Sequence, residues 1–186
     1  ASNGVEESKI FVASNGVGDF WAEKSDKTFK DQLKIKSPYL LYVSHFYFYK
    51  NFENLVLSYD RLPSDIKDNY QLVLVGNPID QDCFDGVKRT IKDLGLCKNV
   101  LVFPGLRSEI LRDLYQNTDL FIFASLIENS PNILLEAMKA GSPVLTTKFQ
   151  PMPEFCESSV EYFDGLDQKN LAFKIENLLR NDSRRR

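Results

Sequence analysis

The sequence predicts an α/β protein with a doubly wound, parallel sheet of six strands. From residue 38 onward, short runs that are apolar throughout alternate with segments whose apolar residues recur at helical spacing. Strands without polar alternation are typical of a parallel sheet that helices cover on both faces. Glycine and proline follow several of these segments and mark turns. The alternation therefore indicates a Rossmann-like domain over residues 38–180.

The predicted strands are short apolar runs, some of them closed by a turn signal such as Gly76-Asn77-Pro78. They are expected at Tyr39–Val43, Gln71–Val75, Val100–Phe103, Asp119–Phe123, Pro143–Thr146 and Val160–Phe163. In the usual strand order 3-2-1-4-5-6, ligands bind outside the strand ends at the switch point between strands 1 and 4. The loops Ser44–Lys50 and Ala124–Glu128 follow those two strands, so we expect them to converge on a ligand site.

Helices are predicted between and after the strands. They are expected at residues 51–62, 83–94, 109–116, 132–140 and 168–179. Gly95 and Gly141 follow two of them, at the position where a left-handed residue ends a helix. Pro131 fits the first turn of the helix 132–140, because its missing N–H breaks no helical hydrogen bond there.

The two ends of the chain carry little pattern. Residues 1–37 are irregular, with a short strand expected at Ile10–Val12 and a charged surface linker at Trp21–Lys36. The pentapeptide Ala-Ser-Asn-Gly-Val occurs at 1–5 and again at 13–17, which is too short to indicate a repeat architecture. Residues 181–186, which end in three arginines, are expected to form a disordered tail.

Composition excludes several classes of protein. The net charge of −3 gives no general attraction to nucleic acid or anionic lipid. Three cysteines without a Cys-x-x-Cys pair argue against a disulfide scaffold or a zinc site, and one histidine excludes a metal site built on several imidazoles. The sequence shows no apolar run of membrane-spanning length and no signal peptide. We therefore expect a cytoplasmic protein without a zinc site or a metal site built on several imidazoles.

The segment 123–147 carries the clearest chemistry. Its pattern is strand, polar loop, helix, glycine stop and strand. The helix start is expected to leave free backbone N–H groups at Asn132 and Ile133, beside the positive pole of the helix dipole, which suits a phosphate. Glu136 lies about one turn into the helix, where it can accept hydrogen bonds from a vicinal diol such as a ribose. Glu128 lies in the loop before the helix and would face the rest of a substrate.

Two glutamates with seven residues between them, around a helix start, resemble the Glu-x7-Glu motif of retaining glycosyltransferases. The resemblance is to the C-terminal, donor-binding half of the GT-B fold, family 4 type. It is supported by the runs Ser130-Pro131-Asn132, Leu135-Glu136-Ala137-Met138 and Ala140-Gly141-Ser142-Pro143-Val144. It implies that Glu128 is the catalytic residue at the donor sugar and that Glu136 holds the ribose. It also implies sugar transfer without a bound metal, and donor contacts from Asn129, Ser130, Pro131, Asn132 and Ile133.

Two further loops enter the expected site through the same resemblance. Family members commonly carry an arginine after the first strand and a lysine five residues later, and both hold the donor diphosphate. His45 and Lys50 keep that spacing here, with Lys50 expected to begin the next helix, so histidine replaces the arginine and weakens the cationic clamp. The turn Gly105-Leu106-Arg107 would lie near the nucleobase, with Gly105 permitting close backbone approach. Arg107 would stack on the base or remain solvated.

The chain is thus interpreted as the donor-binding half of a glycosyltransferase that uses a nucleoside diphosphate-sugar as its donor. Residues 1–37 would be the interdomain connector, and an N-terminal acceptor-binding domain is missing, so the isolated domain is expected to be inactive. The acceptor would be a glycan or a lipid-linked saccharide, and the missing half could bring the enzyme to the inner face of a membrane. A nucleotide-sugar epimerase of the same architecture and a non-catalytic nucleotide-binding module are the alternatives.

Overall fold

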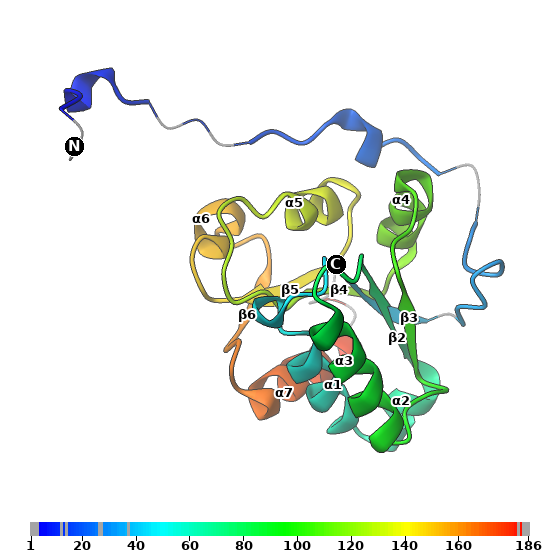
Figure 1. Cartoon of the computed structure of the whole chain (residues 1–186). Helices are drawn as coiled ribbons and strands as arrows, with labels where there is room; N and C mark the ends of the chain where they lie inside the picture. The colour runs from blue at the N-terminus through cyan, green and yellow to red at the C-terminus, as the bar shows by residue number, and fades with distance from the viewer. Residues whose placement is uncertain are drawn as a thin grey trace.

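A computed structural model describes residues 4–11, 13, 15–25, 28–36, 38–181 and 183. Its centre is a six-stranded sheet in the order β3-β2-β1-β4-β5-β6, and every neighbouring pair of strands is parallel. Figure 1 shows this sheet between two layers of helices. The predicted fold class and strand order are therefore confirmed.

The strands occupy the predicted places within two residues at either end. They are β1 (Tyr39–Val43), β2 (Gln71–Val75), β3 (Val100–Phe103), β4 (Leu120–Phe123), β5 (Val144–Thr147) and β6 (Glu161–Phe163). Every residue of β1, β2, β4 and β5 is buried, as expected for strands with a helical layer on each side. Strand β3 is less buried because it lies at the edge of the sheet.

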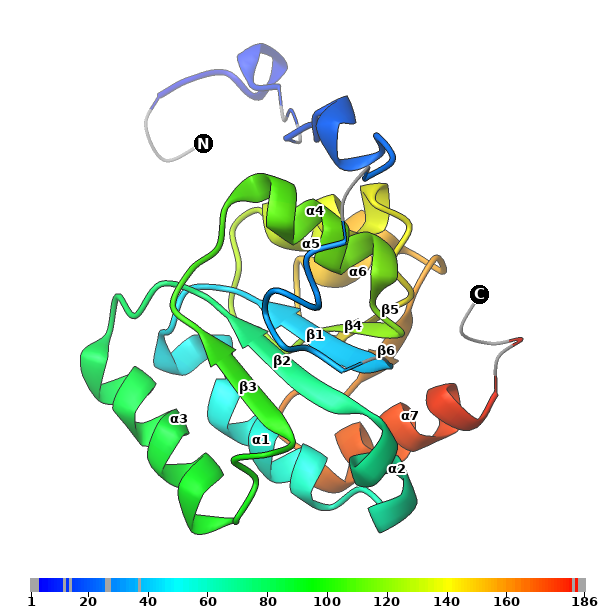
Figure 2. The same ribbon diagram turned by 90° about the vertical axis from the view of Figure 1, so that its right-hand side faces the viewer.

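The helices form two layers, one on each face of the sheet. They are α1 (Phe52–Asp60), α2 (Ser64–Asn69), α3 (Gln81–Asp93), α4 (Ser108–Asn117), α5 (Asn132–Lys139), α6 (Met152–Cys156) and α7 (Gln168–Arg180). Helices α4, α5 and α6 cover one face and α1, α3 and α7 the other, as both views show (Figures 1 and 2). The sequence did not indicate α2 and α6, because each is too short to show helical spacing of apolar residues.

The N-terminal segment differs from its prediction. Ile10 and Phe11 are exposed and belong to no strand, while Val12 lies outside the described residues. Farther along, Phe29 and Ile35 are buried, so the segment from Trp21 is more than a surface linker. The Phe29 N–H donates to Asp113 Oδ2 (2.8 Å), which ties the segment to α4.

Figure 2 shows the N-terminal segment passing outside α4 and α5 and then coming down past α4 to the sheet, where the Lys36 N–H donates to Gln71 Oε1 (2.6 Å) at the start of β2. Its role as an interdomain connector stays a prediction. The proposed disordered tail also stays untested, since residues 182 and 184–186 of it lie outside the described part of the chain.

Candidate functional site

The loops after β1 and β4 meet at the carboxyl ends of their strands, because β1 and β4 are neighbours in the sheet. The Leu126 N–H donates to Tyr49 O (2.9 Å) and so joins the two loops directly. Asn51 Nδ2 donates to Gly165 O (2.7 Å), which adds the loop after β6. The convergence expected at the switch point of a doubly wound sheet is therefore present.

A cavity of about 200 Å³ opens at this edge of the sheet. Five of the predicted site residues line it: His45, Gly105, Leu106, Ile133 and Glu136. The remaining wall residues are Val43, Ser44, Val75, Gly76, Asn77, Leu111 and Tyr115. The cavity thus collects side chains from the ends of β1, β2 and β3 and from helices α4 and α5.

Two glycines shape the backbone wall of this cavity. A Cβ added to Gly76 would lie 1.5 Å from Ser44 O, so the loops after β1 and β2 touch through main-chain atoms. Gly105 has φ +88°, and an added Cβ there would lie 2.3 Å from Asn77 Oδ1. Both positions need glycine for close approach, and Gly105 also needs it for its backbone conformation.

The start of α5 corrects the sequence prediction in two respects. The helix begins at Asn132, so Pro131 precedes it at the N-cap position rather than lying in its first turn. The Asn132 N–H is not free, because it donates to Ser130 O (2.9 Å). Within the described residues, the Ile133 N–H has no acceptor, so this backbone group remains open to a ligand.

The far end of α5 agrees with the prediction. Gly141 has φ +85°, its N–H donates to Met138 O (3.0 Å), and the Ser142 N–H donates to Ala137 O (3.0 Å). These two bonds form a Schellman motif, which ends the helix and starts the path into β5.

Glu136 lies on α5 with its side chain in the cavity wall. Burial raises the pKa of its carboxyl from the usual 4.5 to about 7, while the nearby hydroxyl of Tyr115 acts in the opposite direction. Ionising this carboxyl costs free energy in the free protein, and hydroxyl groups that donate hydrogen bonds to the carboxylate offset that cost. The geometry therefore suits the binding of a diol.

Lys50 and Glu128 form an ion pair, which the sequence did not indicate. Lys50 Nζ lies 2.5 Å from Glu128 Oε1, and the two side chains are only 12% and 11% exposed. Lys50 does not begin α1 as predicted. It ends a 3-10 helix (Phe48–Lys50), and the left-handed Asn51 (φ 63°) separates it from α1.

The Lys50 backbone is also fixed, since its carbonyl accepts from the Tyr42 hydroxyl (2.7 Å). Neither Lys50 nor Glu128 lines the 200 Å³ cavity. The two charges lie at the joined loops after β1 and β4.

The other predicted contact residues lie at the rim. Arg107 is exposed at the start of α4 and does not line the cavity. Asn129 and Asn132 are exposed and Ser130 is half-buried. Asn15 Nδ2 donates to Ser130 Oγ (3.1 Å) and to Asn132 Oδ1 (3.3 Å), so the N-terminal segment reaches this loop.

The aromatic run after β1 divides between core and surface. Phe46 is fully buried and stacks on Phe52, with ring centroids 4.1 Å apart. Tyr47 and Tyr49 stack on each other (5.3 Å), and Phe48 is 67% exposed. Only Phe46 therefore fills the core.

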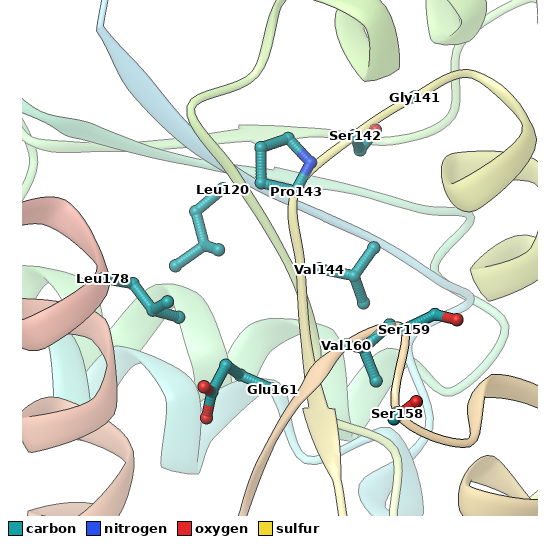
Figure 3. A pocket seen from close by; sticks show the side chains of 10 residues that line it. All are labelled: Leu120, Gly141, Ser142, Pro143, Val144, Ser158, Ser159, Val160, Glu161 and Leu178. Carbon is teal, nitrogen blue, oxygen red and sulfur yellow. The ribbon is translucent and has the colours of Figure 1, made fainter. Parts of the chain in front are cut away.

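A larger cavity of about 410 Å³ lies at the opposite edge of the sheet, at the amino ends of β4, β5 and β6. Figure 3 shows its wall, which includes Ser158, Ser159 and Glu161. Glu161 pairs with Lys174 (3.0 Å), so the one charged wall residue already has a partner. Ligands of doubly wound sheets bind at the carboxyl edge, and the smaller cavity is therefore the candidate site.

Tyr115 is one of the wall residues that sequence reasoning missed. It lies on the apolar face of a predicted helix, where a core role was the simplest interpretation. Asn77 and Asn15 were missed as well, because nothing in their sequence neighbourhood distinguishes them from other turn residues.

Residues 23–186 match the sequence model of the family described as glycosyl transferases group 1. The chain belongs to this family. The glycosyl transferases group 1 assignment agrees with the resemblance carried by Glu128 and Glu136.

Curated sequences and solved structures that resemble this chain include a mannosyltransferase and two proteins of similar fold. The serotype-specific mannosyltransferase WbdA of Escherichia coli is 25% identical over 186 residues, which cover 96% of this chain and 23% of that protein. A solved glycosyltransferase from Rickettsia africae superimposes with a TM-score of 0.80 at 23% identity, covering 95% of this chain and 48% of that one. Anabaena Alr3699/HepE, solved in complex with UDP and glucose, gives a TM-score of 0.80 at 22% identity, covering 91% and 47%.

The chain therefore spans less than a quarter of the mannosyltransferase and about half of each solved neighbour. Its fold is that of the C-terminal domain of a GT-B glycosyltransferase. Neither the epimerase alternative nor the non-catalytic module is favoured by these relatives. Among the described residues, no helix has the length and apolar character that crossing a membrane requires.

Proposed function

We propose that this chain is the donor-binding half of a retaining glycosyltransferase that transfers a hexose from a nucleoside diphosphate-sugar. The observation that carries the proposal is Glu136, held half-buried in a cavity at the switch point of the sheet. A carboxylate in that position can accept both hydroxyl hydrogens of a ribose. The family assignment of residues 23–186 supports the same class of reaction.

The proposed ligand lies along the carboxyl edge of the sheet. The nucleobase would lie beside Gly105 and Leu106, whose backbone can approach closely, and the ribose would bind Glu136. The diphosphate would lie over the open Ile133 N–H and the start of α5, where the helix dipole favours a negative charge.

The proposed chemistry depends on groups that stabilise the leaving diphosphate. Negative charge grows on that diphosphate as the bond to the sugar breaks, and preorganised donors lower the energy of that transition state. Lys50, which pairs with Glu128 in the free protein, supplies a positive charge, and His45 in the cavity wall supplies a further hydrogen bond. Glu128, next to Lys50, would contact the donor sugar. We propose that these groups act without a bound metal ion.

The acceptor side of the enzyme lies outside this chain in the proposal. Since the chain covers about half of each solved neighbour, residues 1–37 would connect it to an acceptor-binding domain. The acceptor would be a glycan or a lipid-linked saccharide, in a cytoplasmic enzyme that reaches the membrane surface through its other half. Because catalysis requires donor and acceptor to be held together, the 186-residue chain alone should form no product detectable by mass spectrometry.

Calorimetric titration tests the donor site directly. The wild-type chain is titrated with UDP, GDP and ADP and with their sugars, and binding of at least one is expected. Glu136→Gln should weaken that binding, whereas Glu109→Gln, an exposed glutamate in the first turn of α4, should leave it unchanged. Absence of binding by the wild type at millimolar ligand would contradict the proposed function.

A further inference from the structure

The hydroxyl of Tyr115 is buried and has no hydrogen-bond partner within the described part of the structure. The Tyr115 side chain is fully buried, so bulk water does not reach the hydroxyl. Buried polar groups in folded proteins are nearly always hydrogen-bonded, and an exception calls for an explanation.

The other fully buried tyrosines obey that rule. The hydroxyls of Tyr39, Tyr42 and Tyr59 each donate to a backbone carbonyl, those of Leu114 (2.8 Å), Lys50 (2.7 Å) and Tyr70 (2.6 Å) respectively. Tyr115 alone among these four tyrosines lines the cavity of the candidate site. Its unpaired hydroxyl is therefore associated with the site and not with the general packing of tyrosine in this core.

The Tyr115 ring is held in place from several directions. Its centroid lies 5.5 Å from that of Trp21 and 5.4 Å from that of Phe121, in edge-to-face arrangements. Its backbone carbonyl accepts from Ser142 Oγ (2.7 Å), which fixes this turn of α4 against the end of α5. A ring held in this way cannot swing elsewhere to find a partner for its hydroxyl.

The charged group that acts on the Tyr115 hydroxyl is Glu136, which lines the same cavity from the neighbouring helix α5. The Tyr115 hydroxyl is directed at Glu136 and, as a weak hydrogen-bond donor, lowers the pKa of that carboxyl against the larger, opposite effect of burial. In the free protein the two groups lie close but form no hydrogen bond of good geometry.

We propose that Tyr115 is a positioning residue of the donor site, whose hydroxyl donates to Glu136 when a nucleotide ribose is bound. The proposal rests on the proposed function of the cavity. Ionised Glu136 has several acceptor positions, so it can receive the ribose hydroxyls and the Tyr115 hydroxyl together. Trp21 then links the N-terminal segment to the donor site through the Tyr115 ring.

The test uses Tyr115→Phe in the full chain, with Tyr39→Phe as the matched control. Tyr115→Phe removes an unpaired buried hydroxyl, so the melting temperature of the free protein should stay the same or rise. The variant should bind UDP or GDP, whichever the wild type binds more tightly, about tenfold more weakly than the wild type does. That loss is in the range expected for a lost hydrogen bond to a charged group. Tyr39→Phe should lower the melting temperature, since its hydroxyl is bonded, and leave the affinity unchanged.

Two further measurements separate positioning from packing. Removing the Tyr115 hydroxyl should move the pH midpoint of nucleotide binding upward, because ionised Glu136 loses a stabilising donor. His45 is the other titratable wall residue, so the midpoint is compared in a His45→Gln background. In a Glu136→Gln background, Tyr115→Phe should have little further effect on affinity.

The nucleotide affinity of the wild type and of Tyr115→Phe distinguishes a wrong role for Tyr115 from a wrong ligand for the cavity. If the wild type binds a nucleoside diphosphate and Tyr115→Phe binds it equally well, Tyr115 has no role in the site. A lowered melting temperature with no change in the pH midpoint would make Tyr115 a structural residue only. If the wild type binds no nucleoside diphosphate at all, both proposals are overturned together.

Discussion

Glu136→Gln should make the free protein more stable above neutral pH while weakening its ligand binding. Burial raises the pKa of Glu136 from 4.5 to about 7, so the folded protein holds a proton that the unfolded chain releases. The stabilisation that this proton gives is complete below pH 4.5 and is lost as the pH rises through about 7. Above that pH, folding must bury an ionised carboxylate.

The size of the effect follows from the raised pKa. A change from 4.5 to about 7 corresponds to at most about 3 kcal/mol of unfolding free energy. The side chain is only half-buried, and solvent screening reduces the expected figure to about 1–2 kcal/mol. Glutamine is neutral at every pH, so the variant should gain about 1–2 kcal/mol over the wild type at pH 8 and only about a quarter of that at pH 5.

Urea unfolding at the two pH values measures this difference. Glu109→Gln on α4 is the control, because that glutamate is exposed and should show no pH-dependent gain. The same Glu136→Gln variant should bind nucleoside diphosphate more weakly, by about 1.5–3 kcal/mol. An equal stability difference at pH 5 and pH 8, or a loss of stability at pH 8, would refute the reasoning about burial.

The remaining predictions concern the charges and the backbone of the site. Lys50→Met leaves Glu128 buried without its partner, so it should lower the free energy of unfolding in urea by about 2–3 kcal/mol. Adding Glu128→Leu to this variant should restore much of that loss. Lys50→Ala should weaken UDP binding more than uridine binding in calorimetry, and equal losses would place the lysine outside the phosphate site. His45→Arg adds a permanent positive charge, so it should tighten the binding of UDP more than the binding of uridine. The same titrations measure both affinities. Gly105→Ala should lower the stability measured by thermal unfolding by about 1–2 kcal/mol, because Gly105 has a positive φ and lies against Asn77. Gly86→Ala on α3 is the control and should not destabilise the protein, since no atom lies within 4 Å of the added Cβ.

The sequence by itself determined the architecture of this protein. Apolar runs without alternation predicted a parallel sheet, and the glycine after α5 predicted where that helix ends. The spacing of Glu128 and Glu136 around a helix start predicted the family. These features depend on backbone conformation and on neighbours close in the chain, so they leave a local pattern.

Tertiary structure decided which side chains meet and which groups remain free. Lys50 and Glu128 are 78 residues apart, and only the adjacency of β1 and β4 brings them to 2.5 Å. The Asn132 N–H was predicted to be free, but it donates to Ser130 O, a contact that depends on the exact turn of the loop. Tyr115 looks like any apolar-face residue in the sequence. Its hydroxyl became notable only when packing between α4 and α5 enclosed it beside Glu136 without a partner, since burial and hydrogen bonding across helices are properties of the folded chain.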